Sequence, residues 1–190
     1  MNQSNHPTPT DEEILSYEKE VKKEFQNCPF VSDLKSLDLL DQEYQSHSIY
    51  LSKIQQLKQK SQGMRMIKKD GNCFYRSFGF RLLELLQQNK QSEFYNQIYK
   101  TILEFKNLFQ ETGYDWSIVE FFFDPFLECL DQDLEQTFNT EYTSDTIVSF
   151  LRILTASYLK KHKELEVFIL DTHSSLEQFI STSVEPSILF

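Results

Sequence analysis

Apolar residues recur at steps of three and four along most of this chain, and this spacing is typical of one buried face of an α-helix. The segments that show it are 14–25, 34–44, 49–57, 74–86, 94–109, 121–130, 147–159, 164–170 and 175–184. Residues 64–67 form a short extended lead before residue 74, and almost no clear strand is present. The pattern therefore predicts a predominantly α-helical chain.

Several of these segments carry boundary signals. Ser144 and Asp145 stand just before the segment 147–159 and are expected to cap its helix. That helix is apolar on more than one face, so we expect it to be buried on two sides. Gly113 is expected to end the helix before it in the chain, and Pro125 to kink a helix or shift its start.

The charge balance is strongly acidic, because 29 Asp and Glu against 19 Lys and Arg give a formal net charge of −10 over 190 residues. Phosphate contacts need basic clusters, so no nucleic-acid partner is expected. An acidic surface suits a basic protein partner, although the plainer interpretation is a solvated surface. Apolar runs such as residues 121–123 are far too short to cross a bilayer, so no membrane association is expected. The length predicts one domain, or one domain with an extension.

The three cysteines, Cys28, Cys73 and Cys129, are odd in number and lie far apart. They show no CxxC spacing, so neither a disulfide framework nor a zinc site is expected. No metal and no organic cofactor is predicted. Free thiols are typical of a reducing compartment, and we therefore expect the protein in the cytoplasm or the nucleus.

Cys73 follows an Asp-Gly turn and heads an apolar stripe that includes Phe74 and Phe78, both expected to face the core. The sulfur is therefore expected at a helix N-terminus, where partial positive charge and free N–H groups favour a thiolate. Gly71 permits a backbone turn that other residues resist. The amides of that turn could face an oxyanion during acyl transfer.

Two plainer interpretations of this motif stay open. Cys73 could be an inert buried thiol, which is a common fate of free cysteine. Asp70 could serve only as a turn residue, since Asp-Gly favours turns, although that role is compatible with a functional one.

A nucleophilic cysteine also needs a base, and no obvious histidine follows Cys73 in the sequence. His6 lies in a polar tail, His47 between two polar helices, His162 among lysines, and His173 in an expected turn. A catalytic triad is spatial and not sequential, so none of the four is excluded. The general base is therefore not identified in this chain.

The run Asp-Gly-Asn-Cys-Phe-Tyr-Arg at residues 70–76 resembles the signature around the nucleophile of the otubains. These are the ubiquitin-directed branch of the ovarian-tumour (OTU) cysteine protease superfamily. Further agreement lies at residues 26–32, 78–80, 143–145, 150–155 and 184–186, so the resemblance extends from about residue 11 to residue 186. It implies an α+β, papain-like OTU fold and a ubiquitin thioesterase of the peptidase C65 type. Such a thiol isopeptidase is a deubiquitinase, which removes ubiquitin from lysine side chains.

The resemblance also implies roles for single residues. Cys73 would be the nucleophile, and Asp70 the acidic active-site residue that shapes the turn. Gly71, Asn72 and Cys73 would offer backbone amides to the tetrahedral intermediate.

The general-base histidine of this family lies on β-strands that would follow Pro186, and the chain ends at Phe190. We therefore expect the β-sheet portion and the base to be missing from this chain. Without that sheet, the helices over residues 74–86 and 147–159 are expected to lack cover. The chain is then expected to fold loosely or to associate with itself.

The expected organisation is a disordered tail over residues 1–10, a helical extension over residues 11–62 and an OTU-like catalytic domain over residues 63–190. The implied partners are ubiquitin or polyubiquitin and, through the N-terminal helix, a ubiquitin-conjugating enzyme. A rival hypothesis is a non-catalytic protein of the same descent that binds ubiquitin or a conjugating enzyme. A helical interaction protein unrelated to ubiquitin is a third.

Overall fold

The computed structural model describes residue 10, residue 16, residues 27–171 and residues 173–186. The tail predicted over residues 1–10 and the helix predicted over residues 14–25 therefore lie outside the described part, apart from these two single positions. Within residues 27–171 and 173–186 the chain is predominantly helical, as predicted.

The helices are α2 (Asp38–Glu43), α3 (Ser48–Lys58), α4 (Cys73–Gln88), α5 (Glu93–Glu111), α6 (Trp116–Glu128), α7 (Leu134–Phe138), α8 (Glu141–Lys161) and α9 (Leu176–Phe179). Shorter turns are the 3₁₀ segments η1 (Cys129–Asp131) and η2 (Lys163–Phe168) and the π-helical turn η3 (Ile180–Val184). The β-type pairing in the described ranges consists of two isolated antiparallel bridges, Val31 with Ile67 and Lys35 with Met64. The extended lead predicted over residues 64–67 is thus confirmed.

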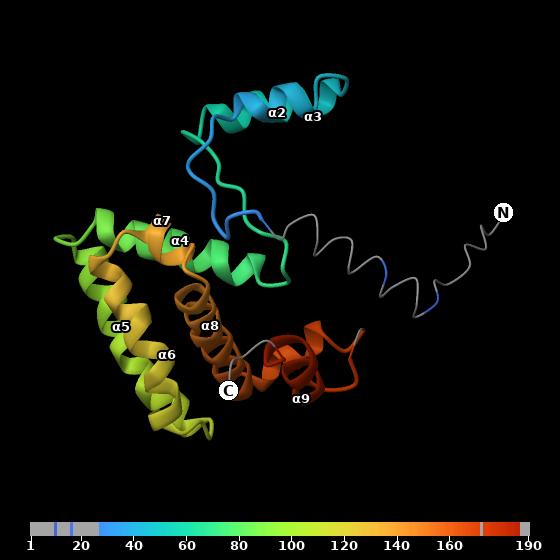
Figure 1. Ribbon diagram of the computed structural model, residues 1–190. Coiled ribbons are helices and arrows are strands. Elements are labelled where there is room, and N and C mark those ends of the chain that lie inside the picture. The colour runs from blue at the N-terminus through green and yellow to red at the C-terminus, as the bar shows by residue number, and fades with distance from the viewer. Residues whose placement is uncertain (1–9, 11–15, 17–26, 172, 187–190) are drawn as a thin grey trace.

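The long helix α8 forms the centre of the fold. Helices α4, α5, α6 and α7 and the turn η3 all pack against it (Figure 1). Ile147, Phe150 and Ile153 are fully buried, and the rings of Phe126 and Phe150 lie 4.6 Å apart between centroids. Burial on two sides is therefore confirmed. The expectation that α8 would lack cover is wrong, because these neighbouring helices already enclose it.

The buried face of α4 differs from the predicted one. Phe74 and Phe78 were expected in the core, but their side chains are 69% and 52% exposed. The buried face instead contains Phe80 and Leu83, and Gly79 lies where α4 meets α8. A Cβ at Gly79 would lie 2.8 Å from Leu151 Cδ1, so the glycine allows the two helices to approach closely. Apolar residues occupy both sides of α4, and periodicity alone could not decide which side meets α8.

The predicted cap of α8 is also wrong. The helix begins at Glu141, after the N-cap residue Thr140, so Ser144 and Asp145 lie inside it. Their side chains bind a buried arginine, as described below. The predicted end of α5 is confirmed, because Gly113 follows the C-cap with a φ of 84°, in the left-handed region that favours glycine.

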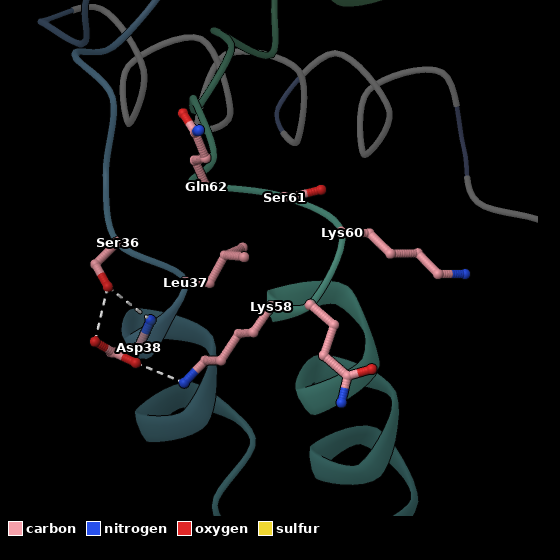
Figure 2. Close-up of a pocket in the computed structure, with 8 residues that line it drawn as sticks. Ser36, Leu37, Asp38, Lys58, Lys60, Ser61 and Gln62 are labelled. Carbon is pink, nitrogen blue, oxygen red and sulfur yellow. Dashed lines mark hydrogen bonds and ion pairs between the residues drawn. The ribbon is translucent and has the colours of Figure 1, made fainter.

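Helices α2 and α3 stand apart from the other helices and are joined to them by two extended segments (Figure 1). Lys35 N–H donates to the Met64 carbonyl over 2.8 Å, which holds these segments together. Lys58 crosses from α3 to Asp38 at the start of α2, with 2.5 Å between Nζ and Oδ1, at a pocket of about 460 Å³ (Figure 2). Within the described ranges, no helix combines the length and the apolar character needed to span a membrane.

Candidate active site

A tight turn over residues 70–72 leads directly into α4, whose first residue is Cys73. Gly71 has a φ of 86°, where a side chain would strain the backbone. Asp70 Oδ1 accepts a hydrogen bond of 2.9 Å from the Asn72 N–H, which closes the turn. The predicted turn and the predicted helix start at Cys73 are both confirmed.

The three thiols occupy different environments. Cys73 is exposed at the head of α4, so it is not the inert buried thiol of the plainer interpretation. Cys129 is buried and donates its S–H to the Pro125 carbonyl over 3.0 Å. Burial raises the pKa of Cys129 to about 12. Cys28 is exposed and belongs to none of the described helices. Cys73 is therefore the thiol that combines access to solvent with a helix N-terminus.

The amides near Cys73 divide into two kinds. The Asn72 N–H is engaged by the Asp70 carboxylate, so in this structure it does not point to an open acceptor site. The N–H of Cys73 belongs to the first turn of α4, whose N–H groups have no intrahelical partner. Of the Asn72 and Cys73 amides, the one at the helix end is thus the open one.

A buried arginine anchors Asp70. Arg76 is fully buried on α4, and its Nη1 lies 2.6 Å from Asp70 Oδ2. Its Nη2 lies 2.9 Å from Asp145 Oδ1, and its Nε donates to Ser144 Oγ over 2.9 Å. The guanidinium also lies 4.4 Å from the centroid of the Phe30 ring. Burial raises the pKa of Asp145, although the neighbouring Arg76 works in the opposite direction. The turn before Cys73 is therefore tied to α8.

A second arginine holds the next residues of the turn. Arg152 on α8 donates to Asn72 Oδ1 from Nη2 over 2.8 Å and from Nε over 3.1 Å. Its Nη1 donates to the Val184 carbonyl over 2.6 Å. The guanidinium lies 4.6 Å from the centroid of the Tyr75 ring. Burial lowers the pKa of Arg152, but an arginine stays charged at neutral pH.

The structure places the described histidines in contacts of their own. His162 Nδ1 lies 2.8 Å from Glu164, and His173 Nε2 lies 3.3 Å from Ser183 Oγ. Neither contact involves Cys73. Of the other histidines, His47 precedes α3 and His6 lies outside the described part. The general base stays unidentified. In the ranges that the structure covers, no group of three or more His, Cys, Asp or Glu side chains could hold a metal ion.

The sequence reasoning missed Arg76 and Arg152 as parts of this site. The usable signal is an arginine within an apolar helical pattern, since a buried charge needs partners. Both arginines lie in such patterns, and both bind residues of the turn that leads into Cys73.

The sequence matches known proteins over nearly its whole length. A sequence model of the family described as Peptidase C65 Otubain matches residues 23–188. "Ubiquitin thioesterase OTUB1" of Homo sapiens is 31% identical over 188 residues, which cover 93% of this chain and 68% of that protein. "OVARIAN TUMOR DOMAIN-containing deubiquitinating enzyme 1" of Arabidopsis thaliana is 33% identical over 180 residues, which cover 87% of this chain and 59% of that protein.

The fold matches solved structures as well. A complex of h/ceOTUB1 with ubiquitin aldehyde and UBCH5B~Ub superposes with a TM-score of 0.77 at 25% identity, covering 93% of this chain and 73% of that chain. A second complex, with UBC13~Ub, gives a TM-score of 0.74 at 25% identity and the same coverage.

Proposed function

The chain belongs to the otubain family, Peptidase C65, and from this membership we propose that it is a cysteine-type deubiquitinase with Cys73 as its nucleophile. The substrate is an isopeptide bond between the C-terminus of ubiquitin and a lysine side chain. One observation carries the assignment of the residue: Cys73 is the exposed thiol that begins a helix, directly after a turn held by two buried arginines.

The chemistry follows from the position of the sulfur. The Cys73 thiolate attacks the isopeptide carbonyl carbon, a C–S bond forms, and the carbonyl oxygen becomes an oxyanion. The first-turn N–H groups of α4 stabilise that oxyanion. The C–N bond then breaks, and the lysine nitrogen leaves as an amine with the proton that the general base took from the Cys73 thiol. Water hydrolyses the thioester, which releases the ubiquitin carboxylate and returns a proton to the sulfur or to the base.

Asp70, Gly71 and Asn72 act in this proposal by shaping the turn. Gly71 supplies the left-handed backbone conformation, and Asp70 closes the turn onto the Asn72 amide. Asp70 is in turn fixed by the buried Arg76. Such preorganisation keeps the Cys73 sulfur in the orientation from which it can attack the carbonyl carbon.

The finer assignment of the fold is part of the same proposal. We assign the α+β, papain-like OTU fold, of which the described helices form the helical part. The likeness in fold to the OTUB1 complexes supports this assignment. The catalytic domain over residues 63–190 and a location in the cytoplasm or the nucleus belong to the proposal too. The free state of all three cysteines supports the reducing compartment.

A non-catalytic role is the second candidate, because the solved structures with the same fold contain UBCH5B~Ub or UBC13~Ub. In that case the chain would bind ubiquitin or a conjugating enzyme and keep Cys73 without using it. The N-terminal helix assigned to that contact lies outside the described residues.

One experiment separates the two functions. The chain is incubated with ubiquitin that carries a C-terminal propargylamide, and covalent adducts are measured by intact mass. The deubiquitinase predicts an adduct that disappears in Cys73→Ser and persists in the matched control Cys28→Ser. Binding without an adduct, measured by titration calorimetry, would support the non-catalytic role. Cleavage of a lysine-linked diubiquitin then tests turnover.

A further inference from the structure

Arg152 makes an unusual set of contacts for a residue in the middle of a buried helix. Two of its nitrogens donate to the same acceptor, Asn72 Oδ1, and Nη2 also lies 3.4 Å from the Gly71 carbonyl oxygen. On its other side, Nη1 donates to the Val184 carbonyl. One guanidinium therefore connects the turn before Cys73 with the turn η3, which lies more than a hundred residues later in the chain.

The contact changes what Asn72 does for α4. Asn72 is the N-cap residue of that helix, and an asparagine there ordinarily accepts a hydrogen bond from an N–H of the first turn. Here its side chain makes no capping hydrogen bond, because Arg152 occupies Oδ1. The first-turn N–H groups of α4 are consequently not capped by Asn72. These are the groups that lie closest to the Cys73 sulfur and to an oxyanion formed on its substrate.

We propose that Arg152 is a positioning residue for the reaction of Cys73, which rests on the function proposed above. It holds Asn72 Oδ1 away from the N-terminus of α4, so that the helix end stays open toward the thiolate and the oxyanion. It acts through Asn72 and does not touch the substrate. When Arg152 is lost, the Asn72 side chain is released, caps α4, and the thiolate loses part of the stabilisation by the helix end.

The alternative is a purely structural role. In that case Arg152 serves only to connect α8 with η3, and its loss lowers stability without a specific effect on Cys73. A double-mutant cycle with Asn72 distinguishes the two roles, because coupling between two residues shows as non-additive effects. Lysine at position 152 keeps the positive charge but lacks the planar fork that reaches several acceptors.

The readout is the rate of alkylation of Cys73 by iodoacetamide at pH 7, followed by peptide mass spectrometry on the full chain. Arg152→Lys is expected to slow this reaction about twofold to fivefold, the range of a lost helix-terminus interaction. In an Asn72→Ala background, the same Arg152→Lys change is expected to have no further effect. Buried Cys129 reports unfolding in the same sample, because its alkylation rises only when the core opens.

Arg65→Lys is the matched control. Like Arg152, Arg65 donates to a backbone carbonyl, that of Ser32 over 2.8 Å, and its guanidinium lies near an aromatic ring, 4.7 Å from the centroid of Phe80. None of these contacts involves the turn before Cys73, so replacing Arg65 is expected to leave the rate of Cys73 alkylation unchanged.

Two results would overturn the proposal: a wild-type rate in folded Arg152→Lys, or an equal slowing with and without the Asn72 side chain. Because the reagent is iodoacetamide, the cycle does not depend on ubiquitin. A failure of the ubiquitin probe with an intact cycle would therefore count against the proposed function alone.

Discussion

Arg76 Nη1 lies 2.6 Å from Asp70 Oδ2, and this ion pair joins a fully buried guanidinium to the turn that precedes the candidate nucleophile. The same guanidinium binds Ser144 and Asp145 on α8, so the turn is held against the central helix of the fold. The placement of Cys73 therefore depends on long-range packing as well as on the local Asp-Gly sequence.

Replacing Arg76 by Leu is expected to destabilise the protein by about 3 kcal/mol, the lower end for breaking a buried ion pair. The lower end applies because the side chains of Asp70 and Asp145 keep 22% and 32% of their exposure and can be partly solvated. Urea denaturation followed by circular dichroism measures the change. Arg81→Gln, on the exposed side of α4, is the control and is expected to cost less than about 0.5 kcal/mol. Equal losses in the two variants would contradict this role of Arg76.

The C-terminal segment is expected to detach in acid because of Glu185. Burial works to raise the pKa of Glu185, but hydrogen bonds from Tyr114 and Lys160 outweigh it and hold that pKa below its usual value. Glu185 Oε1 lies 2.5 Å from the Tyr114 hydroxyl oxygen and 3.1 Å from Lys160 Nζ. A lowered carboxyl pKa contributes stability above the ordinary value of 4.5, and this contribution is lost as the pH falls through the lower folded value.

Hydrogen exchange of residues 176–184 between pH 6 and pH 3 checks this expectation, after correction for the intrinsic exchange rate. Protection should fall toward the acid end in the wild type and change less in Glu185→Gln. Glu177→Gln, an exposed position on α9, should behave like the wild type. The same acid dependence in Glu185→Gln would show that another group controls the segment.

The side of α4 that carries Phe74 and Phe78 is expected to drive self-association. Their rings lie 6.4 Å apart between centroids and are largely exposed, beside Cys73. The double change Phe74→Ser with Phe78→Ser should lower the association constant in sedimentation velocity and alter stability little. Phe80→Ser is the opposite control, because that ring is buried and its loss should cost about 3–5 kcal/mol. Unchanged association in the double variant would exclude this surface.

The three thiols should differ in reactivity under native conditions. Cys73 is expected to react with iodoacetamide faster than Cys28, although both are exposed, because Cys73 stands at the N-terminus of α4 and Cys28 belongs to none of the described helices. Cys129 should be the slowest, since burial raises its pKa to about 12 and keeps it protonated across the neutral range. Peptide mass spectrometry gives the three rates from one sample. A faster reaction at Cys28 would contradict the activation of Cys73.

The local parts of this site could be predicted from the sequence, and the long-range parts could not. Gly71 and the helix start at Cys73 follow from turn chemistry and apolar spacing within a few residues. The pairing of Arg76 with Asp145 joins positions 69 residues apart, which no local pattern encodes. For the same reason, Ser144 and Asp145 resembled a helix cap, although their partner is a buried arginine on another helix.

The burial of α8 could likewise be predicted from the sequence, whereas the choice of the buried face of α4 could not. Its apolar character on several sides correctly predicted a central helix, because such a helix cannot remain in water. On α4, apolar residues on both sides left two possible core faces. The face that is buried contains Gly79, which has no side chain and therefore lets α4 approach Leu151 of α8 closely.

The site of covalent capture by a ubiquitin electrophile tests the central claim most directly. After reaction with ubiquitin propargylamide, the account predicts a single adduct whose cross-linked peptide contains Cys73. An adduct at Cys28, or a Cys73→Ser variant that is captured as well as the wild type, would contradict it.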